Sequence, residues 1–261
     1  MEIGIVGLGQ IGKSFYDCHP DIIDLSVYDP YQGYTTPFKQ LDIINICIPF
    51  VSYEKFKNDI GKFVNNSKTI IIHSTVEPGT TKQLSVDFPE VCFVYSPCCG
   101  VHPNLTESFK TFDKYLGVDN HEKWESNIEM IYNYFKMINI PIQPVSDTKT
   151  IEFMKVLSTS MYSINIAMMF EVEKMCKETN TDFTIVYTKW QESYNKGYTK
   201  LGKGNVCRPI LKLPEGEDRN IGGHCCSNNA VILDRFFKDN WMSKVILGYS
   251  DKSKLYINKN L

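Results

Sequence analysis

The sequence predicts an α/β protein with a Rossmann-type, doubly wound parallel sheet, followed by a helical domain with a long central helix. Three observations support this fold class. Continuous apolar runs recur through the first half of the chain, a GxGxxG motif follows the first of them, and a long apolar stretch without glycine or proline covers positions 148–179. Continuous apolar runs are typical of parallel strands buried on both faces. We therefore expect two domains, 1–147 and 148–261.

The first half contains five candidate strands. They cover 2–6, 24–29, 42–49, 68–76 and 91–97. Strands that alternate with helical stretches indicate a doubly wound sheet. Ligands of such sheets bind at the carboxyl ends of the strands. Polar or turn-forming residues follow those ends here, namely Pro49, Ser74, Thr75 and Ser96.

The motif "GLGQIG" comprises residues 7–12, and each glycine in it has a physical reason. Gly7 allows a tight turn, Gly9 lets the backbone approach a pyrophosphate, and Gly12 lets the helix and strand pack closely. Asp29 ends the second strand about twenty residues later, where an acidic side chain can bind ribose hydroxyls. A carboxylate there repels a 2′-phosphate, so the expected cofactor is NAD. The alternative is a glycine turn without a ligand and an aspartate that only caps a turn.

Composition limits the class of protein. The net charge is −2, so the sequence predicts no basic face for nucleic acid. No apolar run approaches the length of a membrane span, which is about 20 residues. The nine cysteines are scattered and form no CxxC pair. Without an export signal, this pattern indicates a reducing, cytoplasmic setting in which most thiols are packed as small hydrophobic groups.

The second half reads as largely helical. Positions 148–179 predict a long helix on which Glu152 and Lys155 share a face. The segment 182–202 predicts another helix. A loop then carries "NIGGHCCSNN" (220–229), and a further helix is expected from Ala230. From these residues alone, Cys225 could be a nucleophile, a metal ligand or a packed thiol.

Four segments, in this order, resemble the nucleotide-sugar dehydrogenases, the family of UDP-glucose, UDP-N-acetylmannosamine and GDP-mannose dehydrogenases. They are "GIVGLGQIG" with "YDP", "STVEPGTT", "IEFMKVLSTSMYSINIAMMFEVEKMC" and "GGHC". The resemblance extends over residues 2–236. It implies an NAD-dependent enzyme, similar to UDP-glucose 6-dehydrogenase, that oxidises a primary alcohol of a sugar or nucleotide sugar.

The resemblance also implies roles for individual residues. Lys155 would stabilise oxyanion charge or move a proton at the reacting sugar carbon. Cys225 would be the nucleophile that forms a thiohemiacetal and then a thioester. Thr159 and Asn229 take positions where the family has asparagine and aspartate side chains, and they complete the expected catalytic set. The expected cofactor-binding set is Gly7, Gly9, Gln10, Ile11, Gly12, Asp29, Pro49, Ser74 and Thr75.

The chain also departs from the family. Cys98 follows a Ser-Pro pair where the family has glutamate, and Phe170 replaces an asparagine. The family has a further C-terminal domain, which a chain of 261 residues is expected to lack. The family's central helix implies a homodimer. One alternative is a non-catalytic NAD-binding relative. A metal protein is disfavoured, because adjacent cysteines such as Cys225 and Cys226 seldom both reach one tetrahedral ion.

Overall fold

A computed structural model describes residues 1–250 except 22, 101–102, 144, 217–218 and 223. The chain forms two compact units, Met1–Lys155 and Val156–Leu261. The division falls within helix α6 (Thr148–Glu178), so the first two turns of this helix belong to the first unit. None of the helices among the described residues combines the length and apolar character that crossing a bilayer requires.

The first unit is built on one sheet, which confirms the Rossmann-type prediction. Its strands, in chain order, are β1 (Ile3–Val6), β2 (Leu25–Tyr28), β3 (Ile43–Ile46), β4 (Thr69–Ile72), β5 (Cys92–Tyr95) and β6 (Gly117–Val118). The spatial order is β2-β1-β3-β4-β5-β6. Strands β1 to β5 are parallel. The short strand β6 was not expected from the sequence and pairs antiparallel with β5.

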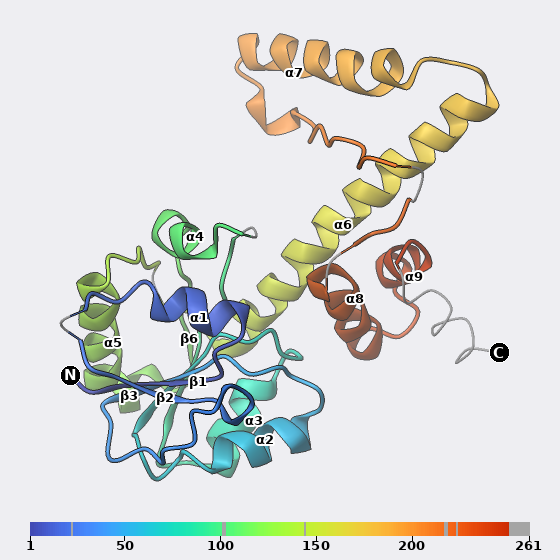
Figure 1. Ribbon diagram of the computed structural model, residues 1–261. Helices are drawn as coiled ribbons and strands as arrows, with labels where there is room; N and C mark the ends of the chain where they lie inside the picture. The colour runs from blue at the N-terminus through green and yellow to red at the C-terminus, as the bar shows by residue number, and fades with distance from the viewer. Residues whose placement is uncertain (22, 101–102, 144, 217–218, 223, 251–261) are drawn as a thin grey trace. The chain divides into compact units, whose positions relative to one another are not determined.

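Helices cover both faces of this sheet (Figure 1). One face packs against α1 (Gln10–Tyr16), α4 (Leu105–Thr111) and α5 (Glu125–Met137), and the other against α2 (Tyr53–Gly61) and α3 (Thr80–Asp87). Side chains alternate along each strand, so neighbouring residues enter different cores. Ile43 joins the first core and Ile44 the second.

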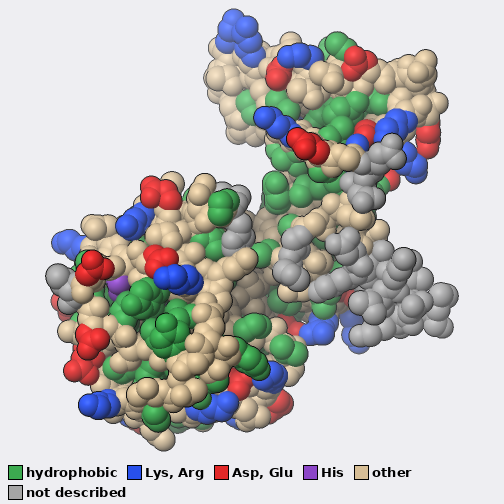
Figure 2. Space-filling view, in the orientation of Figure 1, with side chains coloured by type: hydrophobic (Ala, Val, Ile, Leu, Met, Phe, Trp, Pro, Cys, Tyr) green, Lys and Arg blue, Asp and Glu red, His purple; other side chains and the backbone are tan. Residues whose placement is uncertain are grey.

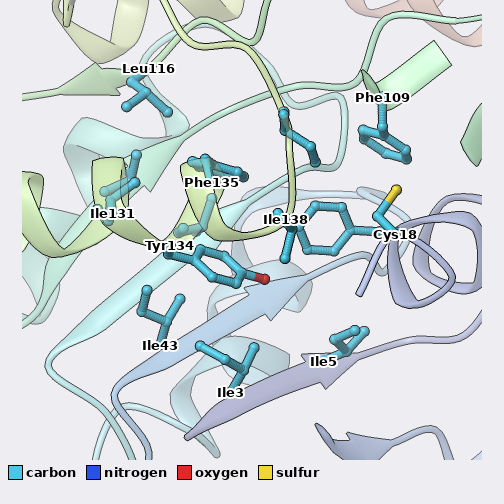
Figure 3. Close-up of a cluster of buried hydrophobic side chains, with 14 of the residues drawn as sticks. Ile3, Ile5, Cys18, Ile43, Phe109, Leu116, Ile131, Tyr134, Phe135 and Ile138 are labelled. Atoms are coloured by element: carbon cyan, nitrogen blue, oxygen red, sulfur yellow. The ribbon is translucent and has the colours of Figure 1, made fainter. Parts of the chain in front are cut away.

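The first core is rich in aromatic side chains (Figure 3). Tyr134 and Phe135 of α5 are fully buried beside Ile3 and Ile43 of the sheet. The Tyr134 hydroxyl is satisfied internally, because it accepts from Asn45 Nδ2 at 3.1 Å and lies 2.8 Å from His19 Nε2. Buried polar groups need such partners, since an unpaired one costs about 1–3 kcal/mol.

The second unit is helical, as predicted. It contains the rest of α6, a π-helical turn η3 (Thr184–Lys189), α7 (Trp190–Lys200), α8 (His224–Phe236) and α9 (Trp241–Gly248). Its core joins side chains of these helices, including Phe170, Tyr187, Ala230 and Ile246.

One boundary in the second unit differs from the prediction. Helix α8 begins at His224 instead of Ala230. The loop prediction for 224–229 was therefore wrong. The polar run after Cys226 is helical, and packing buries Ser227 and Asn229 within the helix.

Both signs of charge are interspersed over the face of the molecule in Figure 2.

Candidate functional site

The glycine loop after β1 has the close contacts that its spacing predicts. Gly7 adopts φ +89°, a conformation that favours glycine. A Cβ atom on Gly12 would lie 1.8 Å from the Gly7 carbonyl oxygen, so only glycine fits there. Gly9 is different, because a Cβ at this position would meet nothing within 4 Å. The loop is thus tightly packed beneath Gly12 and open above Gly9, the arrangement that a pyrophosphate-binding turn needs.

Asp29 follows β2 directly and holds the same loop. Its Oδ2 accepts a hydrogen bond from the Leu8 amide at 2.7 Å, and its Oδ1 accepts one from the Tyr31 amide at 3.0 Å. The side chain is largely buried, with 8% exposed. Each carboxylate oxygen can accept a second hydrogen bond. Asp29 can therefore fix the glycine turn and still accept from a ligand hydroxyl.

A hollow of about 500 Å³ lies beside this loop. Leu8, Gln32, Tyr34 and Phe38 are among the residues that line it. Gln32 is fixed there, since its Nε2 donates to the Leu8 carbonyl at 2.6 Å. The walls combine apolar side chains with a few polar groups, which is typical of small-molecule sites.

The strand order reverses at β1, because β2 lies on one side of it and β3 on the other. Ligands of open α/β sheets bind at such a switch point. Ser74, just beyond β4, donates its hydroxyl to the Ile48 carbonyl at 2.5 Å and joins the ends of β3 and β4. Pro49 is exposed and Thr75 half-buried at these ends. The predicted residues beyond β1, β3 and β4 are therefore neighbours.

Glu152 connects α6 to the start of α3. It is fully buried, and its two oxygens accept from the Gly79 amide at 2.5 Å and the Thr81 amide at 2.8 Å. Burial raises the pKa of the Glu152 carboxyl to about 7, although these hydrogen bonds oppose the shift. Glu152 thus binds the "STVEPGTT" segment to the helix that carries Lys155.

The end of β5 carries two lysine contacts, one of which the sequence did not reveal. Lys155, half-buried, donates from Nζ to the Cys98 carbonyl at 2.8 Å. Lys114 is only 3% exposed and donates to the Ser96 and Pro97 carbonyls at 2.7 and 3.1 Å. Lys114 lies in the polar stretch "TFDKYLG", so no local pattern distinguishes it from a surface lysine.

In the second unit, Cys225 lies in the first turn of α8 and its side chain is exposed. Asn229 lies one turn later on the same face of the helix. It is 2% exposed, and its Nδ2 has no hydrogen-bond partner among the described residues. Cys226 is buried, as expected of a packed thiol. Residue 223 of the "GGHC" motif and residues 101–102 lie outside the described residues.

Two departures from the family pattern also lie on α6. Thr159 is half-buried, and its carbonyl accepts from Ser163 Oγ at 2.9 Å. Phe170 is 3% exposed and lies against Tyr249, with ring centroids 5.9 Å apart. Phe170 is therefore part of the hydrophobic core of the second unit.

Comparison with known proteins gives one clear relative in sequence. No family model matches the chain. The UDP-N-acetyl-D-mannosamine dehydrogenase of Methanocaldococcus jannaschii is 26% identical over 237 residues, which cover 84% of this chain and 50% of that protein. The resemblance to the nucleotide-sugar dehydrogenases is confirmed. The chain spans half the length of this relative.

Solved structures share the fold at low sequence identity. The UDP-D-ManNAc dehydrogenase of Pyrococcus horikoshii matches with a TM-score of 0.70 and 14% identity, over 99% of this chain and 70% of that one. A UDP-glucose dehydrogenase of Pyrobaculum islandicum matches with a TM-score of 0.69 and 14% identity, over 100% of this chain and 70% of that one. The 3-hydroxyisobutyrate dehydrogenase of Mycobacterium tuberculosis matches with a TM-score of 0.71 and 11% identity, over 99% of this chain and 95% of that one.

Proposed function

We propose that the protein is an NAD-dependent dehydrogenase that oxidises a primary alcohol of a sugar or nucleotide sugar. The observation that carries this proposal is the glycine loop, packed at Gly12, open at Gly9 and held by Asp29. It occurs in a chain whose curated relative is a UDP-N-acetyl-D-mannosamine dehydrogenase.

The cofactor site is assigned to the first unit. The backbone at Gly9, Gln10 and Ile11 borders the pyrophosphate, and the hollow lined by Gln32 and Tyr34 receives the adenosine end. Asp29 accepts from the ribose hydroxyls and disfavours a 2′-phosphate, so NAD is preferred over NADP. NAD, when bound, accepts the hydride in each oxidation.

The chemistry at the sugar is assigned to Cys225 and Lys155. The Cys225 thiolate adds to the aldehyde that the first oxidation produces and forms a thiohemiacetal. The second oxidation converts this to a thioester, and water releases the acid. Lys155 stabilises negative charge on the reacting oxygen. Asn229 and Thr159 stand where the family has aspartate and asparagine and cannot act as bases, so hydrolysis of the thioester is expected to be slow.

The test is NADH formation from NAD with a panel that contains UDP-N-acetylmannosamine, UDP-glucose and simple sugars. Nine free cysteines favour a reducing, cytoplasmic setting, so the assay contains a reductant. Two NADH per product are expected, with loss of activity in Cys225→Ala. The matched control is Cys207→Ala, which removes another thiol of the same unit and should leave activity unchanged.

Other outcomes separate the alternatives. One NADH per product, retained in Cys225→Ala, would show simple alcohol oxidation and refute the thiol's role. NAD binding without NADH from any member of the panel would favour a non-catalytic NAD-binding protein. Absence of NAD binding would refute the proposal as a whole.

We also propose a homodimer formed through α6. Three methionines on this helix, Met161, Met168 and Met175, are spaced by seven residues and are 57%, 45% and 57% exposed. A seven-residue spacing keeps side chains on nearly one helix face, typical of helix pairing. Sedimentation should give twice the monomer mass, and Met168→Glu should lower it to the monomer. Lys174→Glu on the same helix is the control.

A further inference from the structure

Lys114 is a buried cation whose partners are backbone carbonyls. It lies between α4 and β6, and its Nζ donates to the Ser96 and Pro97 carbonyls. Rings of Phe109 and Phe135 flank it, with centroids 5.3 and 5.9 Å from Nζ. Among the described residues it forms no ion pair with a carboxylate. A buried charge without a counter-ion is costly, so its contacts to these two carbonyls are its main stabilisation.

The same stretch of backbone accepts from a second lysine. Lys155 Nζ donates to the Cys98 carbonyl, the next one along the chain. Three consecutive carbonyls that leave β5 are therefore held by two ammonium groups. The Ser96 side chain does not help to fix this backbone, because its buried Oγ has no hydrogen-bond partner in the part of the chain that the structure describes.

We propose that Lys114 is a positioning residue for Lys155, and that it acts by holding the backbone of Ser96, Pro97 and Cys98 against which the Lys155 ammonium rests. This proposal rests on the proposed function, in which Lys155 stands at the reacting carbon. The three carbonyls belong to consecutive residues, so a change in the backbone at the first two alters the position of the third. Lys155 then loses an acceptor for its ammonium group.

How firmly Lys114 binds the Ser96 and Pro97 carbonyls depends on its charge. Burial lowers the pKa of Lys114 to about 8, and Lys155 adds to this effect, whereas Cys98, Cys47 and Cys99 oppose it. The titratable groups that face Lys114 come from several elements, namely Cys18, Cys47, His73, Cys98, Cys99 and Lys155. Because the pKa of Lys114 is lower in the closed segment than in an opened, hydrated one, opening becomes harder as the pH rises from 8 toward 10.5. The segment should therefore tighten over this range.

Hydrogen exchange of the segment 94–100 tests this directly and needs no substrate. After correction for the intrinsic effect of pH, protection in the wild type should rise about tenfold between pH 7 and pH 9, the ratio that pKa values of about 8 in the closed segment and 10.5 in the opened one give. Lys114→Met should show low protection that does not change between the two pH values. Lys110→Met, at an exposed lysine of α4, is the control and should match the wild type.

Equal protection at both pH values in the wild type, or equal protection in Lys114→Met and the wild type, would overturn the proposal. A second readout uses activity. The kcat of Lys114→Met should be lower than that of the wild type while KM is unchanged, and Lys114→Arg, which can still donate to the two carbonyls, should restore kcat. A folded Lys114→Met variant with the kcat of the wild type also contradicts the role.

The two proposals fail separately. If no substrate yields NADH, the proposed function is refuted, while hydrogen exchange still decides whether Lys114 holds the segment. If NADH is formed but Lys114→Met leaves both exchange and kcat unchanged, only the positioning role is refuted. Exchange at β1 reports whether each variant is folded.

Discussion

Glu152 gives the first unit a pH-dependent stability that can be measured. The carboxyl is fully buried, and burial raises its pKa from 4.5 to about 7. Because the pKa is higher in the folded than in the unfolded chain, the stabilising contribution is complete below pH 4.5 and is lost as the pH rises through 7. A difference of about 2.5 pKa units corresponds to about 3 kcal/mol.

Glu152→Gln removes this titration while keeping the size of the side chain. Between pH 4.5 and pH 7.5, the free energy of unfolding of the wild type should decrease by up to about 3 kcal/mol relative to the variant. Other groups titrate equally in both proteins, so they cancel in the difference. The variant retains one acceptor oxygen for the Gly79 or Thr81 amide.

Urea unfolding followed by tryptophan fluorescence measures this difference. Trp124 packs on the core of the first unit, whereas Trp190 and Trp241 are exposed in the second. A background with both exposed tryptophans changed to phenylalanine lets the signal report the first unit alone. Glu129→Gln, at an exposed glutamate of α5, is the control. Parallel pH profiles for the wild type and Glu152→Gln would refute the reasoning.

Further predictions concern the loop and the core. Gly12→Ala should prevent folding of the first unit, since its Cβ would lie 1.8 Å from the Gly7 carbonyl oxygen; circular dichroism measures the loss. Gly9→Ala should fold normally, because nothing lies within 4 Å of the new Cβ, but bind NAD more weakly, as calorimetry would show. Tyr134→Phe should lower the unfolding free energy by about 1–2 kcal/mol in urea, because the Asn45 amide and His19 lose a buried partner. Normal folding of Gly12→Ala, the wild-type affinity for NAD in Gly9→Ala, or the wild-type unfolding free energy in Tyr134→Phe would each contradict the contact on which that prediction rests.

The parts of the fold that local sequence determines were predictable. The glycine loop needs only residues next to one another in the chain, and Asp29 follows a strand that its apolar run reveals. The long helix α6 was equally clear from its uninterrupted apolar pattern. In each case the physical cause, either steric freedom or burial, acts over a few residues.

The parts that tertiary packing determines were not predictable. Lys114 resembles a surface residue until Phe109 and Phe135 enclose it. Helix α8 begins early because packing buries Ser227 and Asn229, although their intrinsic preference is for turns. The roles of Cys225 and Lys155 remain predictions from resemblance, since the side chains alone do not specify a substrate.

The exposure of the thiols makes the chain suited to a distance measurement. Of the nine free cysteines, Cys99 and Cys225 are exposed, and one lies in each compact unit. A thiol-reactive spin label or dye would therefore attach preferentially to one position in each unit, without removal of the other cysteines. The separation of the two labels, measured with and without NAD, would show whether cofactor binding changes the placement of the units.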